Sequence, residues 1–197
     1  EDYQKNNPLI LSSVHFFKPK NEISILSKPQ REQDVVALFN QLIAGGVIRS
    51  IELMSSSQIM QYDGVYRYRI DQEDRVYIYD TVENPLGVYI EHIKEFESQP
   101  KILEYKHNLD NLIQEFHNEE KRAKDINLAV CWDIGDKWKE DFECISLLDT
   151  DNISYRRFHG VTHTLKNSIS QIDLIVLSEL IEYLVEPAIA QVKQRDL

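Results

Sequence analysis

Cysteine is scarce in this chain. Its 197 residues include only Cys131 and Cys144, which are too few and too isolated to form a disulfide framework or a zinc cluster. We therefore expect both cysteines to be reduced residues of the core or of a strand, in a cytoplasmic protein. No apolar run reaches the roughly 18 residues that a transmembrane helix needs, so we expect no membrane partner.

Several familiar sequence signatures are missing as well. The chain has no Walker A loop, no Gly-x-Gly-x-x-Gly string and no Gly-x-Ser-x-Gly elbow, so nothing points to a nucleotide-binding loop or an α/β-hydrolase. The polar N-terminus lacks the apolar segment of a signal peptide. Because the first residue is Glu1 rather than Met, we expect the chain to be part of a larger protein.

Basic residues are outnumbered. Lys and Arg total 22 against 33 Asp and Glu, which gives a formal net charge of −11. This charge argues against a general nucleic-acid binder, which usually presents a basic surface. A nuclease remains compatible with it, because metal-binding carboxylates add to the acidic count and phosphate contacts need only a local basic patch.

Hydrophobic spacing predicts a single α/β domain with a mixed central sheet flanked by helices. Ser27 and Pro29 are typical of a helix start, and Gly45-Gly46 of a helix end. The apolar run over 126–132 predicts a strand buried on both faces. Other expected elements are strands at 47–54, 62–70, 75–79, 101–107 and 142–148, and helices at 109–120 and 171–193.

The expected elements divide the chain into three parts. Residues 1–26 form an N-terminal extension, and residues 27–150 form the core. Residues 151–197 form a basic loop and a C-terminal helix, which either packs on the core or provides a dimer seam. Pro187 is expected to bend or end that helix. Residues 62–79 resemble a hairpin, whereas 88–97 fit either a short strand or a helix.

Two short strings on predicted strands carry the chemistry, Tyr62-Asp63-Gly64 and Glu104-Tyr105-Lys106. Residues two apart on a strand point to the same face, so Glu104 and Lys106 should lie together, with Tyr105 on the opposite face. With Asp63 they would hold a divalent metal near a phosphodiester. The alternative is an Asp-Gly turn and an ordinary solvated strand face.

These residues and their element order resemble the PD-(D/E)XK nuclease superfamily, which has the restriction-endonuclease-like fold. That family places an Asp near the start of one core strand and Glu-x-Lys on the next, and many members add a Glu from the first helix, here Glu32. The resemblance covers roughly residues 27–133. The long separation between Asp63 and Glu104 requires an insertion around 71–97.

The resemblance implies a metal-dependent nuclease that hydrolyses phosphodiester bonds of DNA. Asp63, Glu104 and Lys106 would be its catalytic residues. Mg²⁺ or Mn²⁺ would be bound by Asp63, Glu104, the main-chain carbonyl of Tyr105 and, as a further ligand, Glu32. Lys106 would stabilise negative charge or help to lower the pKa of the attacking water. A partner domain or a homodimer would complete the active protein.

Other basic residues are candidates for DNA contact. Lys121 and Arg122 precede the buried strand, and a loop contributes Arg156, Arg157 and His159. A solvated turn and a basic surface loop are the alternatives. Two other functions stay open: a non-catalytic protein-interaction module with an idle nuclease-like fold, which the acidic charge favours, and an enzyme for small phosphorylated substrates.

Overall fold

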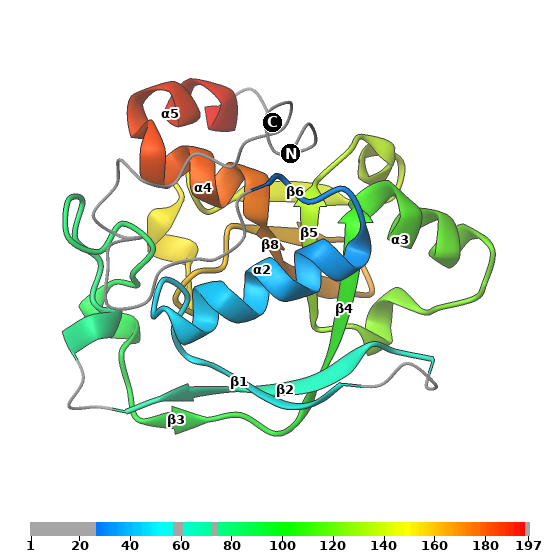
Figure 1. Ribbon diagram of the computed structural model, residues 1–197, viewed down its shortest axis with the longest axis horizontal. Helices are drawn as coiled ribbons and strands as arrows, with labels where there is room; N and C mark the ends of the chain where they lie inside the picture. Colours follow the sequence, from blue (N-terminus) through cyan, green and yellow to red (C-terminus); the bar gives the residue numbers. More distant parts are fainter. Residues whose placement is uncertain (1–26, 57–60, 72–74, 196–197) are drawn as a thin grey trace.

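An eight-stranded mixed sheet forms the centre of the molecule (Figure 1). The structure is a computed structural model that describes residues 27–56, 61–71 and 75–195, so the predicted extension over 1–26 lies outside the described residues. The strand order is β1-β2-β4-β5-β8-β7-β6, and β3 pairs with β2. The strands are β1 (Ile51–Ser56), β2 (Gly64–Ile70), β3 (Phe96–Glu97), β4 (Lys101–Asn108), β5 (Leu128–Asp133), β6 (Glu143–Ser146), β7 (His163–Lys166) and β8 (Gln171–Val176).

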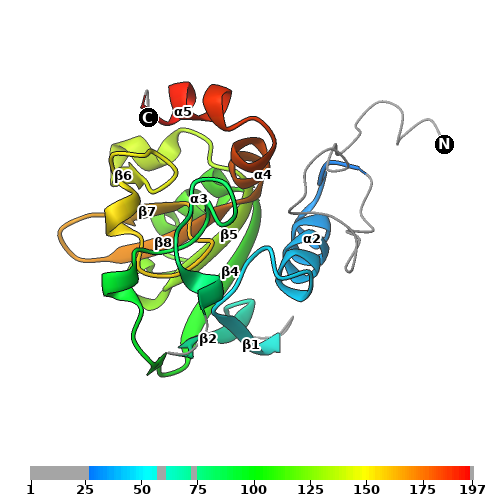
Figure 2. The same cartoon turned by 90° about the vertical axis from the view of Figure 1, so that its left-hand side faces the viewer.

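Helices cover both faces of this sheet, which confirms the predicted mixed α/β class. Figure 2 shows α2 standing to one side of the strands. Within the described residues, no helix combines the length and the apolar character needed to cross a membrane. The helices are α2 (Glu32–Ala44), α3 (Leu109–His117), α4 (Leu177–Val185) and α5 (Pro187–Arg195).

Two hydrophobic clusters hold the helices to the sheet. Helices α2 and α4 share one cluster with Val130, whereas α3 shares the other with Ala129 and Cys131. Successive residues of β5 therefore point to opposite faces and are buried on both. The prediction of a strand covered on both sides is confirmed, and parallel pairing with β4 and β8 accounts for the apolar run.

Helix α2 begins later than predicted. Its N-cap is Arg31 rather than Ser27, because the Asp34 carboxylate accepts hydrogen bonds from the backbone N–H groups of Gln30 at 3.0 Å and Arg31 at 3.1 Å. These bonds satisfy donors that a helix start leaves unpaired. The predicted end is confirmed, with Gly45 as the C-cap and Gly46 in the left-handed region at φ 70°.

The segment between β2 and β4 is less regular than a hairpin. The predicted strand over 75–79 is wrong, since Arg75–Tyr77 form a 3-10 turn and Ile78 makes only an isolated bridge. The Asn84 side chain donates to the carbonyls of Val76 at 2.8 Å and Ile78 at 2.7 Å, and so takes acceptors that a strand ladder would use. Residues 88–97 contain a 3-10 turn and the two-residue strand β3.

The predicted helix over 171–193 is wrong in its first part. Gln171–Val176 form β8, which pairs with β5 on one side and with β7 on the other. A short apolar run fits a helix and a buried strand equally well, and here the sheet neighbours decide the outcome. Pro187 does interrupt the helical stretch, as predicted, because it opens α5, where its missing N–H leaves no bond unmade.

Candidate active site

Strand β2 pairs with only the first half of β4. It begins at Gly64, opposite Leu103, so the later residues of β4 pair with β5 but have no residue of β2 beside them. Asp63, just before Gly64, lies next to this part of β4, and its Oδ2 accepts a hydrogen bond from the N–H of Tyr105 at 2.8 Å. In turn the N–H of Asp63 donates to Glu104 Oε1 at 3.3 Å. The sheet register therefore brings Asp63 and Glu104 together.

Alternation along β4 separates its side chains as the sequence predicts. The Tyr105 ring packs edge-on against Phe39 of α2, with ring centroids 5.8 Å apart. On the other face, Lys106 Nζ lies 3.6 Å from Glu104 Oε2. Because the N–H and C=O of one strand residue face the same strand edge, the Tyr105 carbonyl faces the edge of β4 on which Asp63 lies.

Lys106 contacts three carboxylates that come from three elements. Its Nζ lies 3.1 Å from Glu115 Oε1, 3.6 Å from Glu104 Oε2 and 3.7 Å from Glu32 Oε2. Glu32 is the first residue of α2, and Glu115 lies on α3. Helices from opposite faces of the sheet thus both reach this part of β4.

A second lysine enters from the loop after α3. Lys121 Nζ donates to Glu104 Oε2 at 2.5 Å and lies 3.1 Å from Glu115 Oε2. With Asp63, the group contains four carboxylates and two ammonium groups, so two negative charges are uncompensated when every group is ionised. We call this group the carboxylate–lysine cluster; its members are Glu32, Asp63, Glu104, Lys106, Glu115 and Lys121.

Burial rules out an ordinary solvated strand face for these residues. Glu104 is 0% exposed and Lys106 is 6% exposed. Burying charges is costly unless they are paired. Burial raises the pKa of Glu104 to about 7, with the Asp63 charge adding to the effect and the hydrogen bond from Lys121 opposing it. Burial also raises the pKa of Glu32, against the attraction of Lys106.

The pKa of Lys121 is raised, which favours its charged form. Burial alone would lower this pKa, but the hydrogen bond to Glu104 and the charges of Glu104 and Glu115 outweigh burial and raise it. Lys121 was predicted as a DNA-facing residue, and the structure instead pairs it with carboxylates inside the cluster. It is therefore ionised in the cluster at neutral pH.

Glu115 is the cluster residue that sequence reasoning missed. It follows Leu112 by three positions on α3, a helix whose buried residues are Leu109, Leu112 and Ile113. Residues three apart on a helix are neighbours on its surface, so a carboxylate beside this buried stripe was the available signal. Its side chain is only 24% exposed, which places the charge against the sheet.

Two of the predicted DNA contacts lie at the surface. Arg122 is paired with Asp125 at 2.6 Å, and Asp125 also accepts a hydrogen bond from the Tyr62 hydroxyl at 2.9 Å. Arg157 is exposed and its Nη1 lies 2.7 Å from His92 Nδ1. Both remain accessible to a partner, but the structure brings neither into the carboxylate–lysine cluster.

The predicted contacts of Arg156 and His159 with nucleic acid are wrong, because both side chains are buried at 0% and 1% exposure. Arg156 donates to the backbone carbonyls of Pro85, Gly87 and Leu147. The His159 ring accepts from the N–H of Arg49 at 3.3 Å and its other nitrogen lies 2.8 Å from Asn84 Oδ1. Burial holds the pKa of His159 well below its usual range, so this histidine is neutral.

The donor set of the cluster fits a hard divalent cation. Within residues 27–56, 61–71 and 75–195, no three Asp, Glu, His or Cys side chains are arranged around a common metal position. Glu115 Oε2 is nevertheless a buried oxygen without a hydrogen-bond partner in the described chain. Carboxylate and carbonyl oxygens are the ligands that Mg²⁺ prefers.

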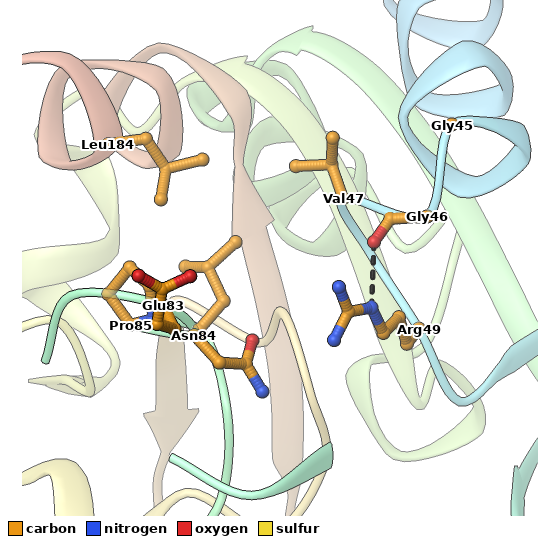
Figure 3. A pocket seen from close by; sticks show the side chains of 9 residues that line it. Gly45, Gly46, Val47, Arg49, Glu83, Asn84, Pro85 and Leu184 are labelled. Carbon is orange, nitrogen blue, oxygen red and sulfur yellow. Dashed lines mark hydrogen bonds between the residues drawn. The ribbon is translucent and has the colours of Figure 1, made fainter. Parts of the chain in front are cut away.

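A separate hollow of about 190 Å³ lies at the opposite end of α2. Figure 3 shows Arg49 at its edge, where Nε donates to the Gly46 carbonyl at 2.8 Å. Glu32 opens α2 and Gly45 closes it, which puts the two ends about 20 Å apart at the usual helical rise. The hollow contains no member of the carboxylate–lysine cluster and does not enlarge it.

Comparison with known proteins adds no further assignment. No model of a known protein family matches the chain, and neither the curated proteins nor the solved structures include a significant match to it. The candidate site therefore has to be judged on its own geometry and charge.

Proposed function

We propose that the chain is a nuclease domain that hydrolyses phosphodiester bonds of DNA with the help of Mg²⁺ or Mn²⁺. The single observation that carries this proposal is the convergence of the half-buried Asp63 with the buried Glu104 and Lys106 beside β4. The N–H of Asp63 donates to Glu104 Oε1, the Asp63 carboxylate accepts from the N–H of Tyr105, and Lys106 lies on the same face as Glu104. This trio is the one that the resemblance to PD-(D/E)XK nucleases implies.

The order of elements supports the restriction-endonuclease-like form of the fold. Helix α2 is followed by β1 and β2, then by the two-residue strand β3, and then by β4, α3 and β5. Apart from the strand expected over 75–79, which does not form, this is the order expected from the sequence. Asp63 precedes β2, Glu104 and Lys106 lie on β4, and Glu32 opens α2. The segment between β2 and β4 accounts for the long spacing between Asp63 and Glu104.

Three oxygen sources would hold the metal. They are the Asp63 carboxylate, whose Oδ1 is not used in hydrogen bonds within the described chain, the Glu104 carboxylate and the Tyr105 carbonyl. A bound divalent ion acts as a Lewis acid and lowers the pKa of a coordinated water. Glu32, half-exposed at the start of α2, would orient that water or a second ion.

Lys106 would stabilise the charge that develops on the phosphate. Its ammonium is almost fully buried, and in such a site an interaction with a developing charge is stronger than in water. The oxygen of water bonds to phosphorus while the bond to the 3′-oxygen breaks. The attacking water loses a proton, the 3′-oxygen gains one, and a 5′-phosphate remains.

The acidic surface favours one competing function, a protein-interaction module whose site is idle. The formal charge of −11 repels DNA, and the exposed Glu119 and Glu120 immediately precede Lys121. Metal dependence separates the two functions. In the nuclease, supercoiled plasmid is nicked with Mg²⁺ or Mn²⁺ and stays intact with EDTA; in the module, it stays intact under both conditions.

A Glu32→Gln variant measures how far α2 contributes to the reaction. We expect its cleavage rate with Mg²⁺ to fall about tenfold, because a water-orienting group contributes less than a direct metal ligand. The rate is measured by plasmid nicking under single-turnover conditions. Glu52→Gln is the matched control, since Glu52 lies on β1 and pairs with Arg67 rather than with the cluster. An unchanged cleavage rate in Glu32→Gln would show that α2 contributes no group to the reaction.

A further inference from the structure

The loop that carries Lys121 is fixed at both of its sides. The N–H groups of Glu120 and Lys121 donate to the Glu115 carbonyl at 3.0 and 3.3 Å, which continues the end of α3. Glu119 adopts a left-handed conformation at φ 59°, which turns the chain back toward the sheet. The Gln61 side chain donates to the Glu120 carbonyl at 2.9 Å. Lys121 therefore enters the cluster from a well-defined backbone position.

Lys121 occupies the oxygen of Glu104 that a metal would use. Glu104 Oε1 is engaged by the N–H of Asp63 at 3.3 Å, whereas Oε2 faces Lys121 Nζ at 2.5 Å and Lys106 Nζ at 3.6 Å. A divalent cation at Glu104 would place two positive charges next to the Lys121 ammonium. Like charges at such short range repel strongly where water is scarce, and Lys121 is only 12% exposed.

Glu115 offers Lys121 a second position. Its Oε2 lies 3.1 Å from Lys121 Nζ and is the buried carboxylate oxygen that lacks a hydrogen-bond partner in the described chain. A small rotation of the flexible lysine side chain would complete this interaction and release Glu104. When every group is ionised, the cluster holds two uncompensated negative charges, which is the amount that one divalent cation neutralises.

We infer that Lys121 is a resident counter-ion that competes with the metal for Glu104 and moves to Glu115 when the metal binds. This inference rests on the proposed function, and it concerns the regulation of the same site. The phosphate of a bound substrate is a further partner for the displaced ammonium, so DNA and metal should strengthen each other's binding.

The test is a calorimetric titration with Mn²⁺ in the absence of DNA. Lys121→Met keeps the length of the side chain and removes its charge, and we expect it to bind Mn²⁺ about tenfold more tightly than the unmodified chain. Lys121→Arg keeps the charge and should bind within about twofold of the unmodified chain. Lys124→Met is the matched control, because Lys124 is exposed and follows Lys121 closely in sequence; its affinity should not change.

The outcomes separate this inference from the proposed function. Equal affinities in Lys121→Met and the unmodified chain, both abolished by Asp63→Asn, would overturn the inference and leave the metal site standing. No Mn²⁺ binding in either chain would overturn both. Binding that appears only in Lys121→Met and depends on Asp63 would support the inference in its strongest form. Thermal unfolding of each variant verifies that it is folded; if Lys121→Met unfolds, Lys121→Gln takes its place.

Discussion

Replacing Lys106 with methionine is expected to lower the rate of Mg²⁺-dependent DNA cleavage by about 1000-fold. The lysine lies on β4 two residues after Glu104, with its ammonium 3.6 Å from Glu104 Oε2. It is the cation that would meet the phosphate beside the metal. Methionine preserves the packing of the side chain along β4 but leaves the developing charge unbalanced. Single-turnover cleavage of a labelled duplex measures the rate.

The Lys106→Met variant should still bind the metal ion although it no longer cleaves DNA. Lys106 is a cation, so its removal should leave Mn²⁺ affinity unchanged or increase it, whereas cleavage is lost. Lys101→Met is the matched control, because Lys101 opens the same strand and its charge acts on Asp173, which is not a member of the cluster. We expect it to cleave at close to the normal rate. Full cleavage in Lys106→Met, with normal folding, would show that the lysine has no catalytic role.

Replacing Arg156 with methionine is expected to destabilise the fold by about 3 to 5 kcal/mol. The guanidinium donates from Nη1 to the carbonyls of Pro85 and Gly87, both at 2.8 Å, and from Nη2 to that of Leu147 at 2.5 Å. Methionine fills much of the same space but leaves three buried carbonyls without a hydrogen-bond donor. Each unsatisfied carbonyl lowers the free energy of unfolding by about 1 to 3 kcal/mol. Arg156 thereby joins the segment between β2 and β4 to the end of β6.

Thermal unfolding measures this effect, and the midpoint should fall by about 10 °C for a domain of this size. The Arg156 guanidinium remains charged at neutral pH, although burial lowers its pKa to about 10. The neighbouring Arg157 is exposed, so Arg157→Met is a closely matched control with an expected change within about 0.5 kcal/mol. Equal midpoints for the two variants would contradict the structural role of Arg156.

The sequence was most informative where local periodicity decides the structure. Alternation along β4 correctly placed Glu104 and Lys106 on one face and Tyr105 on the other. The apolar run of β5 correctly indicated a strand covered on both sides. Strand β4 pairs antiparallel with β2 on one side and parallel with β5 on the other, and Asp63 lies immediately before β2.

Other features depend on contacts between distant parts of the chain and were not predictable from local patterns. The burial of Arg156 and His159 depends on the segment from residue 84 to 87 and on Arg49, far away in sequence. Lys121 enters the cluster because Glu119 reverses the chain after α3. A pattern of charges along one segment cannot reveal such a reversal. The strand at 171–176 was mistaken for a helix because its neighbours in the sheet determine its form.

The most direct measurement is a calorimetric titration with Mn²⁺ at about pH 8, where Glu104, with its pKa raised to about 7 by burial, is mostly ionised. We predict one binding site per chain, abolished by Asp63→Asn and by Glu104→Gln. The site should persist in Asp133→Asn, which alters an exposed aspartate at the end of β5. Mn²⁺ binding that survives both of the first two substitutions, or is absent from the unmodified chain and from Lys121→Met alike, would contradict a metal centre between β2 and β4.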